Sequence, residues 1–137
     1  MTAKQPTPDQ LRTFATDAHD GPIVMINLLK FRDKAEYPAD APEHGDGATG
    51  QEAYARYGAG LATFTGEPQI GLKILYAGPA ARFVIGEGDW DQVAVVFYPS
   101  RAHFVTMTQD PRYHEAHRHR DAGLDHQHLI ETRPMGG

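Results

Sequence analysis

Five stretches of the chain have the apolar pattern of β-strands. The most strand-like is Ile23–Phe31, an apolar run interrupted in its middle by Asn27. Four more strands are predicted along the chain: residues 70–76, which alternate in polarity; 82–86, after a turn at 78–79; 92–98, which are apolar on both faces; and 125–132.

Capping side chains mark the starts of the helices between these strands. Thr7-Pro8-Asp9-Gln10 has a capping Thr, a Pro at the first helical position and a Gln three residues after the cap. Thr49-Gly50-Gln51-Glu52 has the form of a capping box for a second helix. Ser100 and Asp110-Pro111 begin two segments of a broken third helix that ends near Gly123.

The stretch from Arg32 to Ala48 has no apolar periodicity and is rich in Pro, Gly and Asp. Structureless loops of this length are uncommon in compact domains and are usually functional. We therefore expect this loop to be a mobile flap over a cleft.

The order of elements predicts the fold class. A β-α-β-β-α-β order is typical of an α+β, ferredoxin-like sandwich, in which helices cover one face of an antiparallel sheet. We expect one domain over residues 1–137, with an N-terminal helical extension at 1–20, the core at 21–133 and a loose tail at 134–137. The uncovered sheet face is apolar, which predicts a homodimer formed sheet to sheet.

The composition argues against several classes of protein. The 137 residues carry a net charge of −5 and no extended cluster of Lys or Arg, which argues against a nucleic-acid partner. No apolar run is long enough to span a bilayer, and the start lacks the apolar core of a signal peptide. There is no Cys, so disulfides and thiolate chemistry are absent. We expect a cytoplasmic protein.

Several blocks together resemble a known family. They are Ile23–Phe31, Glu52–Tyr57, Gly88–Asp91, Phe97–Arg101, Asp110–Tyr113 and Arg120–Leu124. In this order they resemble the uncharacterised bacterial family called domain of unknown function 1330, over roughly residues 20–133. The resemblance implies the dimeric α/β-barrel superfamily, in which two ferredoxin-like subunits press their sheets together. It implies no reaction.

Haem-degrading monooxygenases of that superfamily offer a sharper comparison. They use an Asn on the first strand, a Trp on the second helix and a haem-ligating His, and here Asn27 and His117 stand at similar places. The position of the Trp is occupied by Met107, and Trp90 lies before a strand instead. Haem breakdown by that mechanism is therefore not expected, and we predict no cofactor.

Three residues are candidates for catalysis: Asn27, His117 and Arg120. A buried amide must find hydrogen-bond partners, so Asn27 either is satisfied by the protein or faces a ligand. His117 can transfer a proton near neutral pH, and Arg120, one helical turn later, can hold a carboxylate or enolate oxygen. The alternative is that His117 and Arg120 lie on a solvated helix face.

Four other residues are candidates for ligand binding. Lys30 and Arg32 end the first predicted strand and suit an anionic ligand, while Tyr54 and Trp90 are placed to line a cleft. Tyr54 and Trp90 are equally suited to packing. Five His residues fall between His114 and His128, but their spacing fits no metal motif, and we predict no metal site.

Two functions remain open. The first is a cofactor-independent small-molecule enzyme, isomerase-like or monooxygenase-like. The second is a non-catalytic dimeric module that binds a small acidic or aromatic ligand. The sequence leaves open whether the protein is an enzyme.

Overall fold

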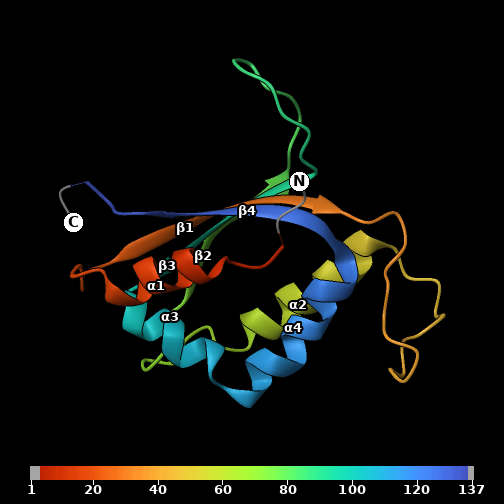
Figure 1. Cartoon of the computed structure of the whole chain (residues 1–137), viewed down its shortest axis with the longest axis horizontal. Coiled ribbons are helices and arrows are strands. Elements are labelled where there is room, and N and C mark those ends of the chain that lie inside the picture. The colour runs from red at the N-terminus through yellow and green to blue at the C-terminus, as the bar shows by residue number, and fades with distance from the viewer. Residues whose placement is uncertain (1–3, 136–137) are drawn as a thin grey trace.

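The computed structural model describes residues 4–135, which form four helices and four strands (Figure 1). Residues 1–3 of the predicted N-terminal extension and 136–137 of the predicted tail lie outside this range. The elements in chain order are α1 (Pro8–Thr16), β1 (Ile23–Phe31), α2 (Gly50–Ala62), β2 (Lys73–Pro79), β3 (Gln92–Tyr98), α3 (Arg101–Thr108), α4 (Pro111–Gly123) and β4 (Leu124–Thr132).

The four strands form one antiparallel sheet in the order β2-β3-β1-β4. This order places the two central strands, β1 and β3, between the two edge strands. With α1 as an extra helix in front, it is the predicted ferredoxin-like arrangement, and the fold class is confirmed. The predicted caps are also confirmed: Thr7, Thr49, Ser100 and Asp110 each accept a hydrogen bond from a backbone N–H of the helix that follows.

All four helices lie on one side of the sheet, and the core fills the space between the two layers (Figure 1). The largest fully buried side chains are Ile23, Leu29, Phe64, Ile70, Leu72, Met107 and Leu124. The other side of the sheet carries the remaining apolar residues of the central strands, with Val24 opposite Phe97, Ile26 opposite Val95 and Leu28 opposite Val93. These side chains are only half-buried, and no helix covers them.

Glycines allow α2 and α4 to approach closely. A Cβ on Gly50 would lie 2.1 Å from the Arg32 carbonyl oxygen and 2.6 Å from that of Gly123. Backbone hydrogen bonds join the same three residues, from Arg32 N–H to the Gly123 carbonyl at 2.9 Å and from Gly50 N–H to the Arg32 carbonyl at 3.0 Å. Further along α2, a Cβ on Gly60 would lie 2.6 Å from the Cβ of Ala116 on α4.

The loop between β1 and α2, which was expected to be a mobile flap, is attached to the helices by several contacts, and its mobility stays a prediction. Tyr37 is buried, and its hydroxyl lies 2.7 Å from His119 Nδ1 and accepts a hydrogen bond from Arg56 at 2.9 Å. Arg118 on α4 donates two hydrogen bonds to Glu43, at 2.7 and 2.8 Å. The sequence concealed this because the anchoring partners lie far along the chain.

The region between the predicted second and fourth strands differs most from the expectation. Ile70 and Leu72 are core residues that precede β2, and β2 itself runs through the predicted turn at 78–79. A register shift between Ile74 and Tyr76 breaks the expected alternation. Residues 82–86 form no strand; they belong to an irregular segment, 80–91, that projects from the body between β2 and β3 (Figure 1).

Replacing the two interior glycines of α2 by Ala should change stability in opposite directions. At Gly58 nothing lies within 4 Å of the added Cβ, so Gly58→Ala should raise the free energy of unfolding by about 0.5–1 kcal/mol through helix propensity. At Gly60 the clash with Ala116 should outweigh that gain, and overpacking of this kind costs about 1–3 kcal/mol. Urea denaturation of the two variants measures the sign of the change in unfolding free energy at each position. Equal effects at both positions would contradict the close packing of α2 on α4.

The attachment of the loop should depend on acid. Hydrogen bonds from Arg118 lower the pKa of Glu43 from 4.5 to about 2. Because the folded-state pKa lies below the unfolded one, the ionised carboxylate stabilises the protein fully above pH 4.5, and this contribution is lost as the pH falls toward 2. Urea midpoints of the wild type and Glu43→Gln should therefore differ above pH 4.5 and converge in acid. A pH-independent difference would show that the ion pair does not anchor the loop.

Candidate functional site

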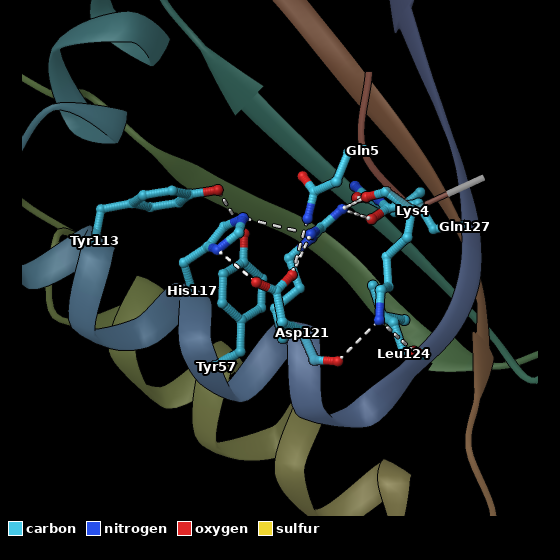
Figure 2. Close-up of polar contacts among 10 residues, drawn as sticks. Lys4, Gln5, Tyr57, Tyr113, His117, Asp121, Leu124 and Gln127 are labelled. Carbon is cyan, nitrogen blue, oxygen red and sulfur yellow. Dashed lines mark hydrogen bonds and ion pairs between the residues drawn. The ribbon is translucent and has the colours of Figure 1, made fainter. Parts of the chain in front are cut away.

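A chain of polar side chains connects the sheet to α4 beneath the N-terminal segment (Figure 2). Asn27 lies in the middle of β1 on the face toward the helices, opposite Ala94, and donates to the Ala94 carbonyl at 3.2 Å. Its Oδ1 accepts from Gln127 Nε2 at 2.9 Å, and Gln127 Oε1 accepts from Arg120 Nη2 at 2.7 Å. Arg120 reaches His117 on the same helix, with Nη1 3.4 Å from the His117 Nε2.

The contacts of His117 assign its tautomer. Nε2 faces a guanidinium and can only accept there, so Nδ1 carries the proton and points to Asp121 Oδ2, 3.3 Å away. Burial alone would raise the pKa of Asp121, but the hydrogen bond to His117 and the charges of Arg120 and Lys4 lower it below its usual value. Asp121 is therefore an anion that orients the His117 ring, and the Nε2 lone pair is directed at Arg120.

His117 opens onto a hollow of about 320 Å³ where α3 meets α4. Thr108, Tyr113 and His114 form the rest of its lining. The ring of Tyr113 lies 5.6 Å from that of His117, and its hydroxyl is 3.5 Å from the hydroxyl of the buried Tyr57 (Figure 2). The hollow is thus lined by two imidazoles, a phenol and a hydroxyl, a combination that suits a small aromatic or acidic molecule.

The N-terminal segment lies across the inner end of this polar chain. The Lys4 carbonyl accepts a hydrogen bond from Arg120, and Lys4 Nζ donates to the carbonyls of Asp121 at 3.1 Å and Leu124 at 3.4 Å. Gln5 Nε2 donates to Asp121 Oδ1 at 3.0 Å. Burial, followed by the charges of Arg32 and Arg120, lowers the pKa of Lys4. The Arg120 guanidinium, which is largely buried, thus donates one of its N–H groups to the uncharged carbonyl oxygen of Lys4.

The structure separates the predicted site residues into two groups. Asn27, Arg120 and His117 are brought together on the helix side of the sheet, and Tyr54 is buried in the same core. Lys30 and Trp90 lie on the opposite face. Lys30 Nζ pairs with Asp89 at 3.0 Å and Asp91 at 3.4 Å, and the Trp90 ring packs 4.8 Å from that of His128.

Arg32 belongs to neither group. It follows β1 beside the start of α2, and its guanidinium pairs with Glu36 at 3.2 Å. Its Nε is buried and makes no hydrogen bond to the part of the chain that the structure describes. Its role as an anchor for an anionic ligand beside the loop stays a prediction.

Sequence reasoning missed Gln127, Asp121 and Lys4. Asp121 had a signal, because a carboxylate four residues after a His on a helix lies on the same face. Gln127 is on an edge strand, and only the register that pairs it with Leu29 brings its amide beside that of Asn27. Lys4 is placed by the return of the N-terminus over α4, which no local pattern indicates.

Two further features concern residues 4–135. Nowhere in that range do three or more His, Cys, Asp or Glu side chains come together in a way that could hold a metal ion. No helix in the same range has the length and apolar character needed to cross a membrane.

Comparison with solved structures identifies a close relative. The protein RPA0582 from Rhodopseudomonas palustris, described as a protein of unknown function, is 35% identical, covers 100% of both chains and superposes with a TM-score of 0.83. A second structure, of methylated RPA0582, is 36% identical over 98% of this chain and 97% of that one, with a TM-score of 0.84. The chain belongs to the same family as RPA0582.

More distant structures share the fold alone. A protein from Bacteroides fragilis, described as dimeric, of unknown function and with a ferredoxin-like fold, is 11% identical over 83% of this chain and 97% of that one, with a TM-score of 0.56. The Arabidopsis thaliana protein At3g17210 is 16% identical over 84% and 97%, also with a TM-score of 0.56. No family model matches the chain, and no curated protein matches it, so its resemblance to domain of unknown function 1330 stays a prediction.

The contact between Asn27 and Gln127 should appear as an energetic coupling. Asn27→Leu leaves the Gln127 amide without its acceptor, which should cost about 1–3 kcal/mol of unfolding free energy. In the double variant Asn27→Leu/Gln127→Leu the orphaned amide is removed, so the cost should fall short of the sum by about 0.5–1.5 kcal/mol. Thr106→Ala, on the far side of α3, provides the control and should be additive with Asn27→Leu. Strict additivity of both pairs would contradict the polar chain.

Proposed function

We propose that this member of the RPA0582 family is a cofactor-independent enzyme that moves a proton on a small acidic or aromatic substrate bound in the hollow at His117. The observation that carries the proposal is the arrangement Asp121–His117–Arg120 beside that hollow. An oriented neutral imidazole next to a fixed cation is what the formation of an enolate requires. This favours an isomerase-like over a monooxygenase-like reaction.

Each residue has a distinct role in this proposal. His117 takes a proton from a substrate carbon through Nε2, once Arg120 turns from that lone pair to the substrate oxygen, and returns the proton to an oxygen. Asp121 holds the ring in the required tautomer. Arg120 balances the negative charge that develops on the substrate oxygen. Asn27 acts through Gln127, because both ends of its amide are engaged within the protein, and so it is a positioning residue. Direct contact of Asn27 with a ligand stays a prediction.

The second candidate is a non-catalytic module that binds a similar ligand in the same hollow. The observation in its favour is that Arg120 already donates to Gln127, Asp121 and the Lys4 carbonyl. A guanidinium with these partners can hold a carboxylate only if the N-terminal segment gives way. Such a site can bind without turnover.

We also propose that the protein works as a cytoplasmic homodimer. The bare sheet face carries Val24, Ile26 and Leu28 beside the apolar side chains of β3. Contiguous apolar surface of this kind usually marks an interface. The Bacteroides fragilis protein of the same fold is described as dimeric, which supports a second copy as the cover.

An enolisable aromatic 2-oxo acid, phenylpyruvate, tests the catalytic proposal. The wild type should accelerate its keto–enol tautomerisation, followed by the absorbance of the enol, and His117→Ala should lower kcat/KM by about 10²- to 10⁴-fold. His44→Gln, in the loop before α2, is the control and should keep full activity.

Amide chemical shifts recorded during titration with phenylpyruvate separate the two candidates. Shifts around His117 without any acceleration would establish the binding module and overturn the enzyme. Acceleration that survives His117→Ala would show that the reaction does not use this site. The absence of both shifts and acceleration would count against this ligand class altogether.

A further inference from the structure

Residues 80–91 form an arm that leaves the body on the side of the sheet away from the helices (Figure 1). Twelve residues separate Pro79, the last of β2, from Gln92, the first of β3. The arm turns back at Gly86, whose φ is +85°. Just before this turn it presents Val84 and Ile85, which are 88% and 90% exposed.

The base of the arm is held firmly, so its direction is set by the fold. Ala80 N–H donates to the Asp91 carbonyl at 3.0 Å, and Asp91 N–H donates to the Leu29 carbonyl at 2.8 Å. The Asp91 carboxylate accepts from Phe31 N–H at 2.9 Å, and Lys30 joins Asp89 to Asp91. Contacts of this kind hold the arm away from its own helices.

The outer part of the arm packs upon itself. The ring of Phe83 lies over Gly88, where an added Cβ would come within 2.4 Å of the ring. Phe83 is thus partly covered within the arm, whereas residues 4–135 leave Val84 and Ile85 almost fully exposed. Removing aliphatic side chains from water is favourable in proportion to the apolar area buried, so a surface that covers Val84 and Ile85 would be favoured.

Two dimensions indicate what that surface is. Six residues out and six back give the arm a reach of about 20 Å, twice the spacing of about 10 Å between two stacked sheets. If a second protein stacked its own sheet on the bare face, the arm would therefore be long enough to extend past the full thickness of that sheet. The sheet face has an outline of about 500 Å², from four strands about 4.8 Å apart and about 26 Å long. The exposed apolar tip of the arm adds surface beyond this outline.

We propose that the arm clasps a second copy of this chain, with Val84 and Ile85 buried against the partner subunit. This inference rests on the homodimer of the proposed function and adds to it the contact that a flat sheet-to-sheet dimer lacks. In a two-fold dimer each subunit both extends an arm and receives one, so the apolar tips of both arms are buried. The bare face and the arm then belong to one continuous interface.

Sedimentation over a dilution series tests the clasp on the full chain. Val84→Glu/Ile85→Glu should leave the protomer folded, since both side chains are solvent-exposed there, and should raise the dimer dissociation constant by at least about 10-fold. The control is Leu11→Glu/Val105→Glu, which alters two exposed apolar residues on the helix side and should leave the dissociation constant unchanged.

The outcomes distinguish the clasp from the dimer. A wild type that is monomeric at micromolar concentration would overturn the homodimer and the clasp together. A dimer with the same dissociation constant in the arm variant would overturn the clasp and leave the sheet-to-sheet dimer standing. Equal weakening by the arm variant and the control would also overturn the clasp, because it would reflect added charge and not the arm.

Discussion

The contact of three backbones at Gly50 sets the geometry on which the rest of the molecule depends. The end of β1, the start of α2 and the end of α4 meet there so closely that any Cβ on Gly50 would overlap the carbonyl oxygen of Arg32 or Gly123. Both helices are thereby fixed relative to the central strand at one end, and the approach of Gly60 to Ala116 fixes their spacing further along. Because α4 cannot shift or rotate independently, its polar side chains point at a defined place on the sheet.

That constraint explains why an apolar strand contains Asn27. From its position in β1 the amide faces the helix layer, and the rigid placement of α4 brings Arg120 to within reach of Gln127, which spans the remaining gap. A buried guanidinium needs acceptors in fixed positions, and a Leu at position 27 would leave the Gln127 amide free to turn. Asn27 therefore replaces an apolar side chain in β1 and, through Gln127, holds the Arg120 guanidinium of α4. Asp121 and Arg120 in turn contact the His117 ring.

Local signals allowed most of the fold to be predicted, and non-local ones account for the errors. Capping at Thr7, Thr49, Ser100 and Asp110 located every helix start, and the apolar runs located β1 and β3, because these features depend on neighbours in the chain. Residues 82–86 looked like a strand because Phe83, Val84 and Ile85 favour extended backbone, yet none of the strands within residues 4–135 pairs with them. Asn27, His117 and Arg120 were recognised by residue type. Gln127 and Lys4 required the sheet register and the path of the N-terminus.

The proposed site lies on the helix side of the sheet and the proposed subunit contact on the other side, and β1 contributes residues to both. Its residues alternate, so Asn27 points to the polar chain under α4 while Ile26 and Leu28 on either side point to the bare face. A partner that covers the bare face would restrict the motion of β1, and through Asn27 and Gln127 that restriction reaches Arg120 and His117. In the proposed dimer, subunit association would therefore be coupled to the order of the site through a single strand, although the residues that line the hollow at His117 belong to α3 and α4.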